Sequence, residues 1–264
     1  MVETIIKWYK KLGFPCHYDE TFYNALKNIS TDSIKNIESY DMECNDGVKN
    51  LLAYLFFCEE TKSRYNELGI PNEILLDTLK DIVTWCNTWS KVKGTLYLGE
   101  LPWLERHLSL RLFRLGRLQF CKQKAPCVIP KYDVLKGEPI IGIHIPEGEK
   151  LSVDACNHSI NQARVFFSKY FPEFDYKIFT CHSWLLDEKL EKFLSKESGI
   201  VRFSNLFDKV NKEESYANLK FLFDWETNID NLSNKEPKSS LSAKVKDAVL
   251  NGEMFYETLG VIKK

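Results

Sequence analysis

The first ninety residues of the chain show apolar positions at the spacing of a helix. From Asn72 onward, apolar side chains recur every three or four residues, in a series formed by Leu75, Leu79, Ile82, Cys86 and Trp89. This spacing predicts one continuous amphipathic helix whose apolar face packs within the chain. Other apolar series of the same spacing precede it, and glycine or proline follows several of them. We therefore expect a mostly helical N-terminal domain over residues 1–92.

The pattern changes after residue 92, where short apolar runs rich in β-branched residues predict strands. The predicted strands are 94–99, 114–123, 139–145, 176–180, 219–225 and a short strand at the C-terminus. Helical spacing returns at 152–170 and 241–250. This alternation of strands and helices is typical of a partly parallel sheet with crossover helices. The predicted fold class is therefore mixed α/β, with a sheet domain over residues 93–264.

Composition narrows the classes of protein to which the chain can belong. Of its 264 residues, 44% are hydrophobic and 28% are charged, as in ordinary globular proteins. A net charge of -1 argues against a general electrostatic affinity for nucleic acid or acidic membranes. No apolar run approaches the roughly 20 residues that span a bilayer, and the N-terminus lacks the apolar segment of a signal peptide. We expect a cytoplasmic protein that binds neither nucleic acid nor membranes.

The eight cysteines predict neither a disulfide framework nor a metal site. They are spread from Cys16 to Cys181 without a C-x-x-C pair, in a chain long enough to fold without disulfides. Zinc ligands usually come in closely spaced pairs, and Cys121 and Cys127 are too loosely spaced for such a pair. We therefore expect reduced thiols, several of them in the core, and no metal.

The loop HIPEGEKLS, His144 to Ser152, joins the most apolar predicted strand to a long predicted helix. A glycine in such a loop lets backbone amides approach an anion, and the N-terminus of the helix adds partial positive charge. Lys150 can reach a phosphate as well. One interpretation is therefore a loop that binds pyrophosphate. The other is an ordinary turn in which Gly148 relieves strain and Ser152 caps the helix.

Two further features lie beside this loop. His144 ends a buried predicted strand, where open α/β sheets bind ligands, and histidine can take a proton from an amine near neutral pH. A histidine that is hydrogen-bonded to a neighbouring loop explains the position equally. Arg114 and Arg117 offer another contact for an anion, although arginines on strands more often pair with carboxylates.

The segment FTCHSWLL, Phe179 to Leu186, places a cysteine, a histidine and a serine side by side. Neighbouring side chains of a strand point to opposite faces, so Cys181 and His182 cannot form a nucleophile–base pair. The segment has no flanking glycine, so it lacks the strained turn of a serine-hydrolase nucleophile. We expect Cys181 to be buried and His182 or Ser183 to line a crevice shared with the loop HIPEGEKLS.

Four sequence segments, taken in order along the chain, resemble those of a known family. They are RLGRLQF (114–120), IHIPEGEKLS (143–152), YFPE (170–173) and CHSWLL (181–186). Through them the chain resembles bacterial acyltransferase domain-containing proteins, which pair a largely helical N-acyltransferase N-terminal domain with a GNAT-like C-terminal domain. The resemblance implies an N-acyltransferase that moves an acyl group from a CoA thioester to an amine. In GNAT folds, a strand–loop–helix unit holds the CoA pyrophosphate, and two parallel strands splay apart to admit pantetheine.

In this chain, the strand–loop–helix unit implied by the resemblance is 139–170, and its splayed partner is 176–183. The implied co-substrate is acetyl-CoA or another acyl-CoA, with a small amine as acceptor. The residues implied for binding the donor are Ile145, Gly148, Lys150 and Ser152. The loop departs from the usual family pattern because it has one glycine and two glutamates, Glu147 and Glu149.

The implied chemistry is direct attack of the amine on the thioester, without a covalent enzyme intermediate. His144, or Glu147 through a water, would take the proton of the amine, and a backbone amide would stabilise the oxyanion. Ser183 or His182 would protonate the departing thiolate. Two alternatives stay open: a catalytically silent GNAT-like module that senses a ligand or binds a protein, and an acyl-carrier step through Cys181.

Overall fold

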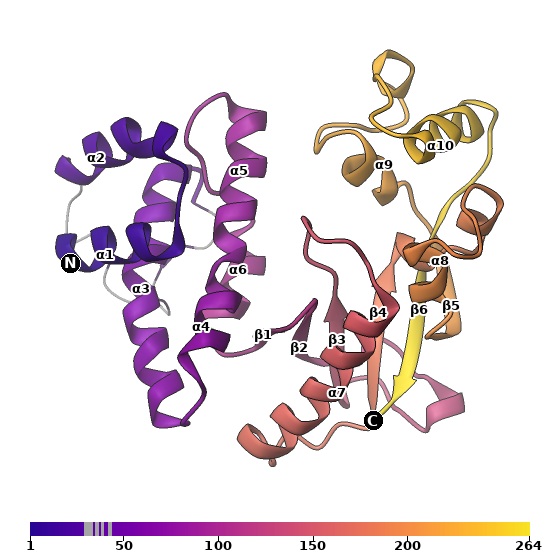
Figure 1. Cartoon of the computed structure of the whole chain (residues 1–264), viewed down its shortest axis with the longest axis horizontal. Coiled ribbons are helices and arrows are strands. Elements are labelled where there is room, and N and C mark those ends of the chain that lie inside the picture. The colour runs from indigo at the N-terminus through magenta and orange to yellow at the C-terminus, as the bar shows by residue number, and fades with distance from the viewer. Residues whose placement is uncertain (29–33, 35–36, 38–39, 42–43) are drawn as a thin grey trace. The chain divides into compact units, whose positions relative to one another are not determined.

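The computed structural model describes residues 1–28, 34, 37, 40, 41 and 44–264, and it divides the chain into two compact units. The first unit is Met1–Leu115 and the second is Gly116–Lys264 (Figure 1). The boundary that we placed after residue 92 lies earlier in the chain than this division. Residues 101–108 stay with the first unit because the Thr61 hydroxyl donates a hydrogen bond of 3.1 Å to the Leu108 carbonyl.

The first unit is built from helices. In chain order its elements are α1 (Val2–Leu12), η1 (Cys16–Tyr18), α2 (Asp19–Lys27), α3 (Gly47–Glu67), α4 (Asn72–Leu79), α5 (Asp81–Lys93), α6 (Leu101–Leu108) and the strand β1 (Leu112–Leu115). Local signals fix the helix ends. The Asp46 side chain caps α3 by accepting a hydrogen bond from the Lys49 amide, and Gly94, with a φ of 69°, ends α5. The helical character predicted for the N-terminal region is confirmed.

The long helix predicted from Asn72 is interrupted. Helix α4 ends at Leu79 and α5 begins at Asp81, so the apolar series belongs to two helices. The Asp81 carboxylate is buried, and its Oδ2 lies 3.1 Å from the Nε2 of His107 on α6 and accepts a bond from the Trp85 indole. A buried carboxylate needs such partners, and the spacing of apolar residues does not reveal them.

The strand predicted at 94–99 was wrong, since these residues, all of them described, form no strand. Leu96 and Leu98 are both buried, which produces the alternation expected of a strand. The Leu98 amide donates to the Gly47 carbonyl at 3.1 Å, so the segment packs against the start of α3. Burial of alternate residues in irregular backbone gives the same sequence pattern as a half-buried strand.

The second unit is a mixed sheet with helices. Its strands are β2 (Leu118–Lys124), β3 (Pro139–His144), β4 (Ile178–Ser183), β5 (Asp208–Glu214) and β6 (Tyr256–Lys263). Its helices are η3 (Pro130–Tyr132), α7 (Val153–Tyr170), η4 (Trp184–Leu186), η5 (Glu188–Lys192), α8 (Gly199–Ser204), α9 (Ala217–Leu222), η6 (Leu232–Asn234) and α10 (Ser240–Leu250). The strand order is β1-β2-β3-β4-β6-β5, with β3 and β4 parallel and joined by α7. The predicted mixed α/β class, with a partly parallel sheet, is confirmed.

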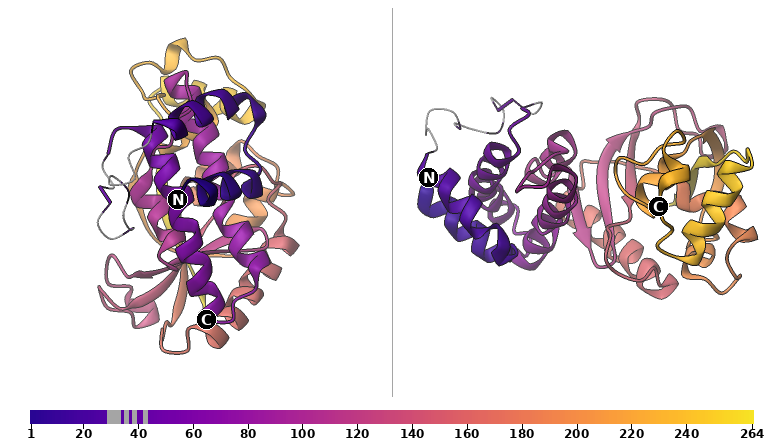
Figure 2. Two further views of the ribbon diagram at one scale, coloured as in Figure 1. Left: turned by 90° about the vertical axis from the view of Figure 1, so that its left-hand side faces the viewer. Right: turned by 90° about the horizontal axis from the view of Figure 1, so that it is seen from above.

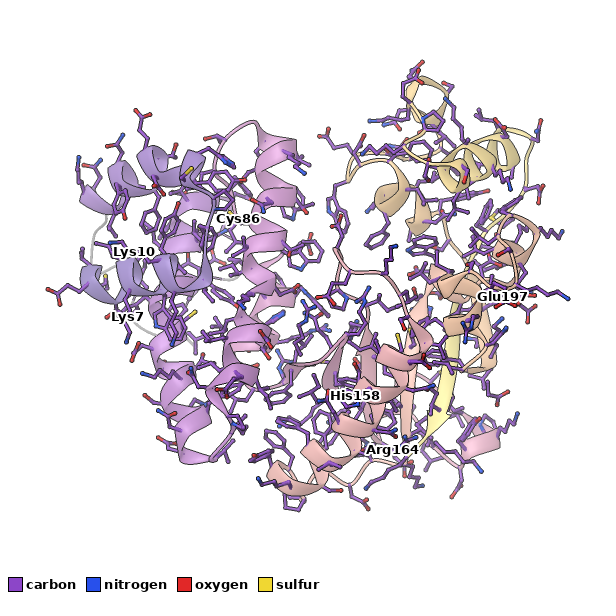
Figure 3. The ribbon with its side chains drawn as sticks, viewed as in Figure 1. Lys7, Lys10, Cys86, His158, Arg164 and Glu197 are labelled. Atoms are coloured by element: carbon purple, nitrogen blue, oxygen red, sulfur yellow. The ribbon has the colours of Figure 1, made fainter. Side chains whose placement is uncertain are left out.

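The two faces of this sheet are covered differently (Figure 2). Helix α7 lies on one face, where Cys156 of the helix and Cys181 of β4 are both buried. Residues 125–138 cover part of the other face, where Ile129 and Val134 belong to a buried cluster with residues of β3, β4 and β6. Arg164 of α7, labelled in Figure 3, donates a 3.0 Å hydrogen bond to the Lys263 carbonyl and ties the helix to the end of β6.

The strand predicted at 114–123 is interrupted by a turn. Strand β1 ends at Leu115, the turn is Gly116–Arg117, and β2 begins at Leu118. Gly116 has a φ of 67°, and a Cβ at this position would lie 2.9 Å from the Ser159 hydroxyl oxygen of α7. The turn therefore needs a glycine both for its backbone conformation and for its close approach to α7.

A second strand prediction, at 219–225, was also wrong. Residues 219–222 belong to α9 (Ala217–Leu222), and Phe223 directly follows it; Leu219 and Phe223 are buried, and Phe221 is 59% exposed. Burial four residues apart is helical spacing. The remaining strand of the sheet is β5, whose sequence DKVNKEE has few apolar residues because it lies at the edge of the sheet. None of the helices that the structure describes is long and apolar enough to cross a bilayer.

Candidate active site

The parallel strands β3 and β4 separate near their carboxyl ends. The residues paired between them in the described chain are Ile141 with Phe179 and Gly142 with Thr180. Strand β3 nevertheless runs on to His144 and β4 to Ser183. Each strand end stays paired on its outer side, His144 with Gln119 of β2 and Ser183 with Thr258 of β6. Beyond Gly142 and Thr180 the described chain shows no further residue pairing between β3 and β4, and we place the candidate site between these strand ends.

Arg117 holds the loop that follows β3. Its side chain is buried, and its three guanidinium nitrogens donate to three backbone carbonyls of the loop. The bonds run to Pro146 (2.9 Å), Glu149 (2.7 Å) and Lys150 (3.1 Å). We had considered Arg117 as a contact for an anion, but its donors bind the loop itself. The carbonyls of the loop are thereby turned toward Arg117, which the phrase RLGRLQF alone did not reveal.

Two glycines complete the support of this loop. Gly148 has a φ of 104°, a backbone conformation that side-chain-bearing residues rarely adopt. Gly199, the first residue of α8, lies so close to the loop that an added Cβ would clash with the Leu151 carbonyl oxygen. The loop is thus held by Arg117 on one side and by the start of α8 on another.

The residues predicted to bind the donor all lie in this loop or directly after it. Ile145 is half-buried, and Gly148, Lys150 and Ser152 are exposed. Ser152 occupies the N-cap position of α7, and within the described structure its side chain makes no capping hydrogen bond. The first amides of this 18-residue helix are therefore not capped by Ser152, and they carry the partial positive charge that favours an anion.

The residues predicted for catalysis lie on both faces of the sheet. His144 and His182 share the face opposite α7, because Gly142 and Thr180 are paired and side chains alternate along each strand. Ser183 lies on the α7 face, and its Oγ accepts a 3.1 Å hydrogen bond from the Leu185 amide. His182 is exposed, with Nε2 3.3 Å from Glu213 Oε1 of β5.

Glu147 is exposed in the loop after β3, near the half-buried His144. Cys181 is 1% exposed, whereas its neighbour His182 points to solvent. The prediction that these two residues face opposite sides is confirmed. Burial raises the pKa of the Cys181 thiol from its ordinary value of 9.0 to about 12, and the nearby Cys156 adds to this effect. The thiol is therefore protonated near neutral pH and is a poor nucleophile.

An aromatic cluster follows directly after β4. Trp184 stacks on Phe221 of α9 with ring centroids 6.1 Å apart, and Phe221 meets Trp225 edge-on at 5.4 Å. Phe221 is among the more exposed large apolar side chains of the described residues. The alternation of residues 219–225 concealed this cluster, because it predicted a strand in place of α9.

A hollow and the metal-binding types of side chain were the other candidates for a site in the described structure. A hollow of about 410 Å³ lies between residues 127–131 and the start of β5, and none of the predicted site residues lines it. Among the described residues, no group of three or more histidine, cysteine, aspartate or glutamate side chains is placed to hold a metal ion. The separated ends of β3 and β4 are therefore the candidate site.

Sequence families match both parts of the chain. Residues 112–262 match the GNAT-like C-terminal domain, and residues 7–110 match the N-acyltransferase N-terminal domain. The chain belongs to the family of proteins with a GNAT-like C-terminal domain. The resemblance that we based on four sequence phrases is confirmed. No curated protein matches the chain.

Solved structures of acyltransferases have a similar fold. One is a crystal structure of an acyltransferase in complex with decanoyl-CoA and teicoplanin, with a TM-score of 0.71 and 26% sequence identity. Another is a mutant acyltransferase in complex with octanoyl-CoA, with a TM-score of 0.70 and 27% identity. In both comparisons, the similarity covers 81% of this chain and 65% of the other chain. The chain therefore spans about two thirds of the length of these structures.

Proposed function

We propose that this protein is an acyltransferase that moves an acyl group from a CoA thioester to a small amine. The observation that carries the proposal is the end of β3–β4 pairing at Gly142 and Thr180, in front of a loop held by Arg117. Membership of the GNAT-like family and the acyl-CoA complexes of similar acyltransferases support it. The teicoplanin complex of one of them supports a small-molecule acceptor.

In this proposal, the donor binds along the loop and between the strand ends. The pyrophosphate meets backbone amides of the loop around Gly148 and the first turn of α7, with Lys150 and Ser152 beside it. Pantetheine then lies between the unpaired edges of β3 and β4, next to Ile145. The exposed Glu147 and Glu149 oppose an anion, so the backbone and the helix terminus supply most of the attraction.

The chemical step is direct attack of the amine on the thioester carbonyl. His144, or Glu147 through a water, takes the amine proton, and a backbone amide at a strand end stabilises the oxyanion. His182 or Ser183 protonates the leaving thiolate from its own face of the sheet. The burial and raised thiol pKa of Cys181 argue against an acyl-cysteine intermediate. A cytoplasmic location without nucleic-acid or membrane partners stays a prediction.

A ligand-binding measurement tests this proposal. Octanoyl-CoA at about 100 times its dissociation constant stabilises a protein by about 2.7 kcal/mol, which corresponds to about 5–10 °C in melting temperature for a chain of this size. We expect such a shift with octanoyl-CoA and, in a panel of amines, release of CoA detected by chromatography with the acylated amine detected by mass spectrometry. No shift with acetyl-CoA, octanoyl-CoA or decanoyl-CoA would contradict the proposal and favour a catalytically silent module.

A further inference from the structure

Gln119 of β2 is a buried polar residue whose donor is unused within the described structure. Its side chain is 2% exposed, and its Nε2 has no hydrogen-bond partner there. Buried side-chain amides normally have partners, because a donor removed from water without a replacement loses free energy. Such a donor is available to a group that a ligand supplies.

The position of Gln119 connects this donor to the candidate active site. Gln119 lies directly opposite His144 in the antiparallel register of β2 and β3, so both side chains are on the same face. Side chains in such a pair have Cβ atoms about 5 Å apart. His144 lies beyond the last residue of β3 that pairs with β4, which is Gly142. Gln119 therefore flanks His144 on the side of β3 away from β4, one strand from the point at which β3 and β4 separate.

A second side chain of β2 provides a natural control. The amide of Gln123 lies over Gly142, where it occupies the space that a Cβ would take. Gln123 is half-buried and lies opposite Ile140, further from the carboxyl end of β3 than Gln119. The two glutamines share a face and a chemistry, and only Gln119 lies opposite His144.

We propose that the Nε2 of Gln119 donates a hydrogen bond to the carbonyl oxygen of the bound thioester; this assignment rests on the proposed function. When the amine attacks, its nitrogen forms a bond to the carbonyl carbon, and its proton passes to His144. The C–S bond then breaks, and CoA leaves as a thiolate that takes up a proton. Gln119 exchanges no proton. Its bond strengthens as the carbonyl oxygen gains negative charge, so Gln119 supplements the backbone amide that meets the oxyanion.

The test compares two ligands that differ at the carbonyl group. Octanoyl-CoA has the thioester carbonyl, and S-octyl-CoA, a thioether, lacks it. By isothermal titration, the wild-type protein should bind octanoyl-CoA about tenfold more tightly, the usual size of one neutral hydrogen bond. Gln119→Leu, which has no donor at this position, should lose most of this preference. Gln123→Leu should keep the tenfold preference.

The same variants distinguish an effect on folding from an effect on ligand binding. Gln119→Leu replaces an unpartnered amide with an apolar side chain of similar size, so its melting temperature without ligand should not fall. Its affinity for S-octyl-CoA should match that of the wild type. A Gln119→Leu protein that keeps the tenfold preference, or a wild type without one, overturns the role of Gln119 and leaves the proposed function intact. A wild type that binds neither ligand overturns both.

Discussion

Arg117 is the residue on which the geometry of the candidate donor site most depends. Its buried guanidinium donates to three carbonyls of one loop, at 2.7–3.1 Å. Hydrogen bonds from a charged group are stronger than neutral ones, and the fixed planar arrangement of donors matches three acceptors at once. A single residue therefore sets the direction in which the loop presents its amides.

The first prediction concerns the replacement of Arg117. Arg117→Ala removes the donor from one buried and two partly buried carbonyl contacts, so we expect a loss of about 3 kcal/mol in the free energy of unfolding and at least tenfold weaker binding of octanoyl-CoA. Arg117→Lys keeps the charge but not the planar set of donors, and it should show an intermediate defect. Chemical denaturation and calorimetric titration measure the two effects.

Arg111→Ala is the matched control for this series. Arg111 is exposed and pairs with Glu105 in the first unit, so its removal should change stability by less than about 1 kcal/mol and leave affinity unchanged. Equal effects of Arg111→Ala and Arg117→Ala would contradict the role assigned to the loop contacts.

The second prediction follows from the raised pKa of Cys181. Its folded-state pKa of about 12 lies above its ordinary value of 9.0, so the stability linked to the neutral thiol is fully present below pH 9 and is lost as the pH rises toward 12. Between pH 9 and 11, wild-type stability should fall more steeply than that of Cys181→Ala, by up to about 1.4 kcal/mol per pH unit. Urea denaturation at each pH measures the slopes, and parallel slopes would contradict the raised pKa of the Cys181 thiol.

At the scale of elements, the close approach of α8 to the loop after β3 gives the third prediction. Gly199→Ala places a methyl group against the Leu151 carbonyl oxygen, and the backbone must move to relieve the clash. We expect a loss of about 1–3 kcal/mol in stability and weaker binding of octanoyl-CoA. Ser195→Ala, an exposed change in the preceding segment, is the control. If Gly199→Ala left the affinity for octanoyl-CoA unchanged, α8 would not contribute to the donor site.

The fourth prediction concerns the junction of α4, α5 and α6. Asp81 accepts hydrogen bonds from the indoles of Trp85 and Trp103 and lies 3.1 Å from His107. Asp81→Ala leaves these buried groups without their acceptor and should reduce stability by about 3–5 kcal/mol. Asp77→Ala removes only an exposed pair with Lys80 and should cost less than about 1 kcal/mol. Thermal unfolding followed by tryptophan fluorescence compares the variants, and equal melting temperatures would contradict the assignment.

The elements that sequence patterns predicted well are those with one buried face. Helix α7 has a regular apolar stripe, and β3 is almost wholly apolar because both of its faces are covered. Sequence patterns predicted the wrong element where tertiary contacts determine the secondary structure. The alternating residues 219–225 lie at the end of α9 and just beyond it, where Leu219 and Phe223 are buried while Phe221 is exposed. The edge strand β5 was missed because it has little apolar face to detect.

The same holds for the candidate site: local sequence patterns predicted its segments, but not the tertiary contacts that shape it. The loop 144–152 and the segment 179–186 were recognisable from sequence, since turn residues and apolar strands mark the ends of β3 and β4. The contacts that shape the site were not. Gln119 reads as an ordinary polar position of a strand, and only the register with His144 and the absence of a partner for its Nε2 in the described structure distinguish it.

At the scale of the whole molecule, the two sequence families and the two compact units agree. The N-acyltransferase N-terminal match ends at residue 110 and the GNAT-like match begins at 112, close to the division after Leu115. The elements that form the candidate donor site, from Arg117 to Ser183, all belong to the second unit. The acyl-CoA site that we propose therefore lies within residues 116–264.

Hydrogen–deuterium exchange with octanoyl-CoA tests this assignment most directly, because it reports which backbone amides a ligand protects. The account predicts slower exchange on binding in two separate peptides, one covering 143–155 and one covering 181–186, with little change at 127–131 beside the hollow near β5. Protection of the 127–131 segment, with unchanged exchange at 143–155 and 181–186, would place the ligand elsewhere and contradict the account.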